Sequence, residues 1–206
     1  MTDREARMRL TEIGRRFDAR GWVSGTSGNF SIVRARRPLR LVMTASSVHK
    51  GRLTSRDFVD VDARGQSRSR RARPSAEARL HLQVVAARGA GAVLHTHSIW
   101  STILSDRHVA AGGLAIEGYE MLKGLDGIAT HVHREWLPIL DNSQDMAVLS
   151  DRVEALLAGH PAAHGFLLRR HGLYTWGASL EDAARHIEIL EFLLEAVGRT
   201  DSSARR

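Results

Sequence analysis

Short apolar segments alternate with longer amphipathic ones along most of this chain, and this alternation restricts its possible folds more than any other feature. A few consecutive apolar residues bounded by turn residues are typical of a β-strand, whereas apolar residues that recur at helical spacing are typical of an amphipathic helix. Strands interleaved with helices predict an α/β domain built in layers. Because several predicted strands follow one another with no helix between them, we expect a mixed, largely antiparallel sheet.

The predicted elements cover nearly the whole sequence. We expect strands over residues 30–33, 39–44, 59–61, 92–96, 114–116, 137–140, 166–169 and 173–176. We expect helices from Thr2 or Asp3 to Gly21, from Ser75 to about Arg88, from Ser98 to Leu104, from Asn142 or Ser143 to Leu157 and from Ser179 to about Gly198, with a helical turn near Glu120. Ser75 would cap its helix and place Glu77 in the first turn, where the helix dipole favours a carboxylate.

The length and the apolar content fit one domain. A chain of 206 residues with 43% hydrophobic content can bury one sizeable core but is short for two. We expect one domain over residues 1–199, with a central sheet flanked by helices in three layers, and a disordered tail over residues 200–206. No apolar run has the length of a membrane span, and the N-terminus lacks the apolar core of a signal peptide, which predicts a cytoplasmic location and no membrane partner.

The formal net charge of +7 raises the alternative of a basic nucleic-acid-binding module. The densest basic stretches are residues 34–40 and 64–73, which both fall in predicted turns or loops. Few aromatic side chains are available to stack on bases. We therefore expect a solvated, arginine-rich surface and no nucleic-acid partner.

The most informative local motif is His95-Thr96-His97, at the end of the predicted strand 92–96. Side chains two residues apart in an extended segment point to the same side, so the two imidazoles converge on one point, as a divalent metal requires. The chain contains no cysteine, so any metal must be held by histidines and carboxylates. The alternative is a pair of partly buried histidines that are hydrogen-bonded to backbone or water.

A metal needs a third ligand, and His171 is the strongest candidate. It lies between an apolar predicted strand and Gly172, and a glycine lets the backbone turn tightly beside a ligand. For His131 and His133, which lie in a polar run, a surface strand or loop is the favoured interpretation. The remaining candidates are His49, His81, His108, His160, His164 and His186.

Three groups of small polar residues suggest a phosphate-bearing substrate. They are the turn Gly25-Thr26-Ser27-Gly28-Asn29, the cluster Ser46, Ser47, Lys50 and Gly51, and Ser75 at a helix start. Neither the Walker A nor the Rossmann glycine pattern occurs at a strand-to-helix junction. Glu77 and Glu120 are the carboxylates that could exchange protons beside a metal, although each could equally be a solvated helix residue.

The order of these motifs resembles the class II aldolase family of zinc enzymes that act on sugar phosphates. The resemblance runs through residues 25–29, 44–53, 75–81, 95–97 and 171–172. It implies that His95, His97 and His171 bind one Zn²⁺ per subunit. It also implies a homotetramer with active sites near the subunit boundaries, and a phosphorylated ketose as substrate.

Within that family, residues 120–125, 137–139 and 142–145 resemble the dehydratases of methionine salvage rather than the aldolases. This resemblance implies a hydro-lyase that converts 5-methylthioribulose 1-phosphate to 2,3-diketo-5-methylthiopentyl 1-phosphate, with Glu120 as the catalytic acid/base. Glu77 stands where aldolases have a carboxylate that can ligate zinc or move protons. A sugar-phosphate aldolase or 4-epimerase is the alternative.

The same resemblance assigns phosphate binding to Asn29, Ser46, Ser47 and Ser75. Lys50 and Lys123 are further candidates on a separate ground, because they are the only two lysines of an arginine-rich sequence and an ammonium is a compact charge that arginine does not replace. The sequence departs from the family at two positions. Ser47 replaces a usual glycine, and Ala76 replaces a serine that aldolases carry.

Overall fold

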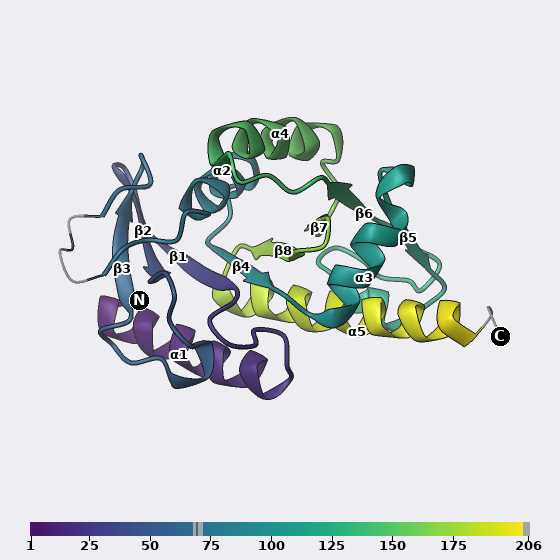
Figure 1. Cartoon of the computed structure of the whole chain (residues 1–206), viewed down its shortest axis with the longest axis horizontal. Coiled ribbons are helices and arrows are strands. Elements are labelled where there is room, and N and C mark those ends of the chain that lie inside the picture. The colour runs from purple at the N-terminus through teal and green to yellow at the C-terminus, as the bar shows by residue number, and fades with distance from the viewer. Residues whose placement is uncertain (68, 70–71, 204–206) are drawn as a thin grey trace.

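The computed structural model describes residues 1–67, 69 and 72–203, and its centre is one mixed sheet (Figure 1). The eight strands of the described residues run in the order β3-β2-β1-β4-β8-β7-β6-β5. Only β6 and β7 are parallel, and the other neighbouring pairs are antiparallel. The expected mixed, largely antiparallel sheet is confirmed.

The predicted strands and helices occur in the expected order. The strands are β1 Asn29–Arg36, β2 Leu39–Thr44, β3 Phe58–Asp62, β4 Ala92–Thr96, β5 Gly113–Glu117, β6 Arg134–Leu140, β7 Gly165–Leu168 and β8 Gly172–Gly177. The α-helices are α1 Asp3–Ala19, α2 Ala78–Arg88, α3 Ile99–His108, α4 Met146–Gly159 and α5 Leu180–Ser203. The short helical turns are η1 Lys50–Arg52, η2 Val109–Ala111 and η3 Glu120–Gly124.

Helices cover both faces of the sheet, which gives the expected three layers (Figure 1). One apolar core, which includes Phe17 and Leu190, lies between the sheet and helices α1, α3 and α5. A second core, which includes Val84 and Leu149, lies between the opposite face and helices α2 and α4. No helix of the described ranges is both long and apolar enough to cross a membrane.

Two helices begin three or more residues later than the sequence predicts. Helix α2 begins at Ala78, so Glu77 occupies the N-cap position and not the first turn, although Ser75 Oγ still accepts a hydrogen bond from the Glu77 amide at 3.2 Å. Helix α4 begins at Met146, because the Asp145 carboxylate accepts from two amides of its first turn and so supplies the cap expected at Asn142 or Ser143.

Helix α5 continues past Gly198 to Ser203, so the predicted helix end is wrong. The glycine serves a close approach between helices, because a Cβ at this position would lie 2.1 Å from Cε3 of Trp100 on α3. Residues 200–203, which we expected in a disordered tail, are therefore helical. Residues 204–206 of that predicted tail lie outside the described residues.

Strand β4 lies in the middle of the sheet, between β1 and β8. In its register, His95 stands opposite Asn29 of β1 and opposite Tyr174 of β8. The sheet thus brings residues from three distant parts of the sequence to the same end of the molecule. The candidate site is built around this end of β4.

Candidate metal centre

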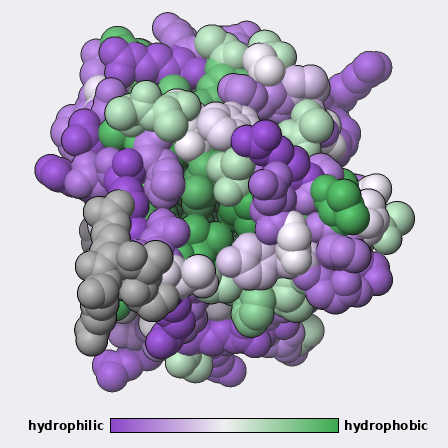
Figure 2. All heavy atoms as spheres, turned by 90° about the vertical axis from the view of Figure 1, so that its right-hand side faces the viewer, coloured by the Kyte–Doolittle hydropathy of each residue, from purple (hydrophilic) through white to green (hydrophobic). Residues whose placement is uncertain are grey.

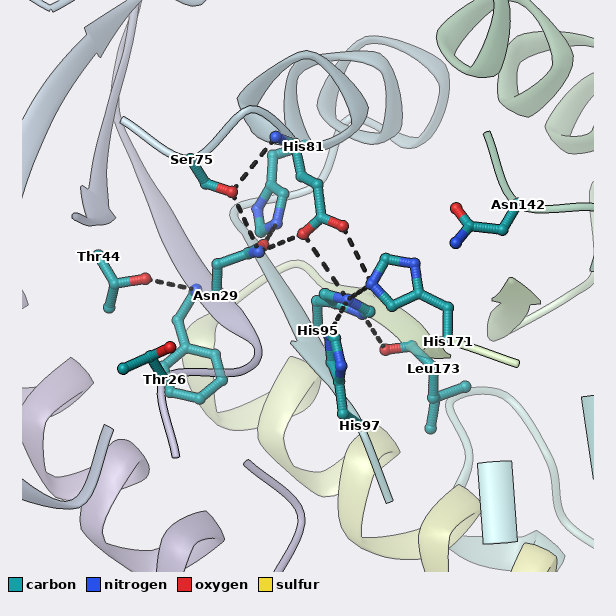
Figure 3. A network of polar contacts seen from close by, with 12 residues as sticks. Thr26, Asn29, Thr44, Ser75, His81, His95, His97, Asn142, His171 and Leu173 are labelled. Carbon is teal, nitrogen blue, oxygen red and sulfur yellow. Dashed lines mark hydrogen bonds and ion pairs between the residues drawn. The ribbon is translucent and has the colours of Figure 1, made fainter. Parts of the chain in front are cut away.

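His95, His97 and His171 converge as the sequence predicts (Figure 3). His95 is the penultimate residue of β4, His97 follows that strand, and His171 lies in the turn between β7 and β8. The Nε2 atom of His95 lies 2.8 Å from Nε2 of His97 and 3.3 Å from Nε2 of His171. The three ligand atoms all lie within 4.8 Å of one another, which is the arrangement that a shared metal ion needs.

The hydrogen bonds of His95 fix which of its nitrogens faces this centre. Its Nδ1–H donates to the Leu173 carbonyl at 2.9 Å, so in the neutral ring Nε2 carries the free lone pair. A backbone carbonyl behind a metal-binding imidazole is the usual way in which proteins orient such a ligand. This donor set of imidazoles, with no thiolate, fits a divalent metal ion.

Burial keeps these three imidazoles uncharged, which is the state that binds metal. Burial, together with charge repulsion from His171 and Lys50, lowers the pKa of His97 to about 3. Burial also lowers the pKa of His95 well below its usual value, with added repulsion from the other two rings. For His171, burial lowers the pKa and outweighs the opposing effect of Glu77.

The turn that carries His171 depends on two neighbouring residues in different ways. Arg170, with φ of 53°, takes the left-handed conformation that we expected glycine to provide. Gly172 instead allows a close approach of two strands, because a Cβ there would lie 2.0 Å from the Thr96 carbonyl oxygen of β4. Gly172 therefore supports the site, but for a different physical reason.

Glu77 is the carboxylate that the fold places beside the three histidines. Its Oε1 lies 3.2 Å from His171 Nε2, and its Oε2 lies 3.7 Å from His95 Nε2. The side chain is only 14% exposed. A carboxylate in this position can act as a fourth metal ligand or exchange a proton with a bound substrate.

Asn29 and His81, which lie side by side in Figure 3, form a buried series of hydrogen bonds that leads to the Glu77 carboxylate. The Asn29 amide donates hydrogen bonds to the Glu77 carboxylate and, at 3.4 Å, to Ser75 Oγ. His81 contacts Asn29 Oδ1 through Nε2 at 2.5 Å and Ser31 Oγ through Nδ1 at 2.8 Å. His81, a candidate third ligand from the sequence, is thus outside the histidine cluster, and the part played by Ser31 was missed.

Five of the six residues predicted to hold phosphate, all but Lys123, share one cavity of about 210 Å³, which also reaches His97 and Glu77. Polar and small side chains line most of it, and a buried lysine lies at its wall. The lining residues are Thr26, Ser27, Gly28, Asn29, Ala45, Ser46, Ser47, Lys50, Ser75, Glu77 and His97. Such a cavity offers hydroxyl, amide and ammonium donors to an anion.

Two residues of this cavity have unusual local environments. Lys50 is buried, its Nζ donates to the carbonyls of Thr26 and Val48 at 2.9 and 2.8 Å, and burial lowers its pKa to about 8. Its ammonium therefore remains mostly protonated at pH 7. Ser47 has φ of 60°, a backbone conformation that favours glycine.

Glu120 and Lys123 lie outside this cavity. The Glu120 side chain in η3 is 71% exposed, and it pairs with Lys123 Nζ at 2.6 Å and with His131 Nδ1 at 3.8 Å. Hydrogen bonding and charge from Lys123 lower the pKa of Glu120, so it is ionised at neutral pH. Within one chain, the carboxylate next to the histidines is Glu77.

A second group of histidines surrounds a buried carboxylate that the sequence did not reveal. Strand β6 begins at Arg134, earlier than predicted, and buries Glu135 almost completely. Glu135 lies 2.9 Å from His133 Nε2 and 3.0 Å from His164 Nδ1. Glu135 raises the pKa of His164 against the effect of burial, and neither residue belongs to the three-histidine cluster.

The three-layer fold and the histidine centre define a class II aldolase-type domain, and comparison with known sequences agrees. Residues 8–197 match the family model for the class II aldolase and adducin N-terminal domain. The chain belongs to this family.

Among its relatives, the methylthioribulose-1-phosphate dehydratase of Pseudomonas savastanoi pv. phaseolicola is 42% identical over 196 residues, which cover 95% of either chain. The enzyme with the same name from Methylococcus capsulatus is 44% identical over 187 residues, which cover 90% of this chain and 89% of that one. The similarity thus runs through nearly the full length of both relatives.

Solved structures share the fold at lower sequence identity. L-fuculose-1-phosphate aldolase from Thermus thermophilus superposes with a TM-score of 0.78 at 22% identity, over 100% of both chains. YgbL from Klebsiella pneumoniae superposes with a TM-score of 0.79 at 25% identity, over 97% of this chain and 91% of that one. These likenesses support the architecture and not a particular reaction.

Proposed function

We propose that this chain is a metal-dependent hydro-lyase that dehydrates 5-methylthioribulose 1-phosphate to 2,3-diketo-5-methylthiopentyl 1-phosphate in methionine salvage. The observation that carries the proposal is the converging, uncharged histidine set in a chain 42% identical, over 95% of its length, to a methylthioribulose-1-phosphate dehydratase. We place the enzyme in the cytoplasm, since its substrate would be a phosphorylated metabolite.

We assign the metal as Zn²⁺, one per subunit, held by His95, His97 and His171. Three imidazoles with a free coordination position are a common donor set for catalytic zinc. When bound, the ion would polarise the substrate carbonyl and make the neighbouring C–H more acidic. The 2.9 Å hydrogen bond from His95 to Leu173 would keep that ligand in the tautomer that binds metal.

The substrate phosphate would occupy the small polar cavity beside the metal ligands. Ser46, Ser47 and Ser75 supply hydroxyl groups, and Lys50 supplies a buried positive charge. A buried ammonium strengthens anion binding because little solvent screens it. Lys123 would act on the substrate only from outside this cavity, since it pairs with Glu120.

The dehydration needs one group to take a proton from C3 and one to assist the departure of the C4 hydroxyl as water. The enol that remains then tautomerises to the diketone, so no carbon–carbon bond breaks. Glu77 stands beside the metal ligands and can hold a proton there. We retain Glu120 as the acid/base on the strength of the family resemblance, although it lies outside the cavity of its own chain.

We infer that Glu120 meets the substrate bound to a neighbouring subunit of a homotetramer. Met121, next to Glu120 in the sequence, is exposed. Val132, next to the His131 that pairs with Glu120, is 74% exposed. Ile99 of α3 is 72% exposed. Figure 2, which views the end of the molecule where α3, β5 and β6 lie in Figure 1, shows a hollow with apolar side chains among hydrophilic ones. An apolar surface of this kind is typical of a subunit interface.

The test is a substrate panel on purified protein whose zinc content is measured. We expect the diketone, and no aldehyde, from 5-methylthioribulose 1-phosphate, and no cleavage of fuculose or ribulose phosphates. Glu77 beside the metal also fits an aldolase or 4-epimerase, and aldehyde release or epimerisation would favour that alternative. Protein that binds no metal, with a His97→Ala variant of unchanged stability, would contradict both enzyme assignments.

A further inference from the structure

We propose that His81 is a positioning residue, which together with Ser31 fixes the Asn29 side-chain amide so that Asn29 holds the Glu77 carboxylate against the three histidines, where it serves as a fourth ligand of the bound metal. This inference rests on the proposed metal centre. It assigns a role to two buried residues, His81 on α2 and Ser31 on β1, that the proposed reaction does not otherwise use.

The hydrogen bonds that link Ser31, His81, Asn29 and Glu77 can run in only one direction. The Glu77 carboxylate is an acceptor, so the Asn29 amide nitrogen donates to it. The Asn29 oxygen must then face His81, and it accepts from the Nε2–H of that ring at 2.5 Å. The Nδ1 atom of His81 consequently has no proton and accepts from the Ser31 hydroxyl at 2.8 Å.

Burial leaves these polar atoms no solvent partners in place of one another. His81 and Ser31 are fully buried and Asn29 is 5% exposed, so solvent does not compete for their polar atoms. Burial also lowers the pKa of His81 to about 3, so the ring is neutral at pH 7 and carries a single N–H. If that proton moved to Nδ1, the lone pair of Nε2 would face the Asn29 oxygen and favour a reversed amide.

A reversed Asn29 amide would point its oxygen at the Glu77 carboxylate. Two acceptors would then face each other, and the carboxylate would be driven from its position 3.2 Å from His171. In the observed orientation, both N–H groups of Asn29 are directed to Glu77 and Ser75. Both Asn29 N–H groups are therefore used by Glu77 and Ser75. The proposed contacts to the substrate phosphate are consequently those of the serines and Lys50.

His81 also has an apolar role that can be separated from this polar one. Its ring packs edge-on against Tyr174, with ring centroids 5.9 Å apart, and Tyr174 stacks on His95 at 3.9 Å. A phenylalanine at position 81 keeps an aromatic ring of similar size but has no N–H to donate. A glutamine lacks the ring but can place an N–H near the position of Nε2.

The experiment compares H81F with H81Q. The Zn²⁺ dissociation constant of each variant is measured by competition with a chelator. Loss of a group that orients a metal ligand typically costs about 10- to 100-fold in metal affinity, and we expect that loss in H81F. We expect H81Q to retain most of the wild-type affinity, although it removes the aromatic packing. A structural role for the ring alone would give the opposite order.

Two further measurements make the result decisive. In an E77Q background, H81F should cause no additional loss of Zn²⁺ affinity, because the positioning acts through Glu77. In the wild type at pH 7, ¹⁵N NMR should show His81 protonated on Nε2 alone, which is a readout that does not depend on how any variant folds. Protonation on Nδ1, or equal Zn²⁺ affinity in folded H81F and wild type, would overturn the inference.

These readouts separate the inference from the proposed reaction, since none of them needs substrate. A wild type that binds Zn²⁺ but does not dehydrate the ketose phosphate would refute the reaction and leave the role of His81 to be judged on metal affinity. A wild type that dehydrates the substrate, with H81F unaffected in Zn²⁺ affinity, would refute only the role of His81.

Discussion

A methyl group at position 172 tests how closely β4 and β8 must approach beside the proposed metal ligands His95 and His171. A Cβ on Gly172 would lie 2.0 Å from the Thr96 carbonyl oxygen and 3.0 Å from Cε1 of His95, whereas ordinary contacts begin at 3.4 Å. The nearest atom is backbone in the middle of the sheet, so it cannot rotate away. Overpacking of this kind typically costs about 1–3 kcal/mol of stability.

For a domain of this size, that loss corresponds to a decrease in Tm of roughly 2–12 °C, since each kcal/mol shifts Tm by about 2–4 °C. We expect Gly172→Ala to lower both the Tm in differential scanning calorimetry and the Zn²⁺ affinity, because the strand that moves carries His95. Gly159→Ala at the end of α4 is the control, since a Cβ there meets nothing within 4 Å. A Gly172→Ala protein with wild-type Tm and Zn²⁺ affinity would refute the argument.

Three other predictions follow from the same geometry. If Glu120 acts on substrate bound to a neighbouring subunit, a co-refolded mixture of H97A and E120Q, each inactive alone, should regain dehydratase activity. A mixture that assembles but stays inactive would mean that Glu120 acts in the active site of its own subunit. Removing zinc with EDTA should lower Tm by roughly 5–11 °C relative to protein in free Zn²⁺ at about 100 times its Kd. The reason is that binding at this concentration stabilises the folded state by about 2.7 kcal/mol. An unchanged Tm would mean that no metal binds. Burial raises the pKa of Glu191 from 4.5 to about 7. The folded state therefore favours the protonated carboxyl, and the contribution of Glu191 to the free energy of unfolding decreases as the pH rises from about 4.5 to 7. Denaturation of wild type and E191Q across that pH range should show a steeper decrease in the wild type than in E191Q, and parallel curves would contradict it.

The sequence predicts those features that depend on local periodicity. His95 and His97 were identifiable because side chains two apart share a side of an extended segment, and the structure brings their Nε2 atoms to 2.8 Å. His171 was identifiable because Gly172 follows it. The structure shows why a glycine is needed there: the Thr96 carbonyl oxygen of another strand leaves no room for a side chain. The sequence does not reveal this contact.

The features that could not be predicted depend on partners distant in sequence. Gly198 looked like a helix end, but it accommodates Trp100 of another helix. The polar run of His131 and His133 predicted a surface strand or loop, but Glu135 at its end is buried, where His133 and His164 pair with its carboxylate. The separation of Glu120 from the histidines depends on the path of a loop, which local residue patterns do not specify.

The most direct test of a zinc-dependent dehydratase is a titration of metal-free protein with Zn²⁺, in which the initial rate of diketone formation from 5-methylthioribulose 1-phosphate is followed. Our account predicts that the rate rises with added Zn²⁺ until each chain has one equivalent and then stays constant. A rate that does not depend on Zn²⁺, or protein that is saturated with Zn²⁺ and still forms no diketone, would contradict it.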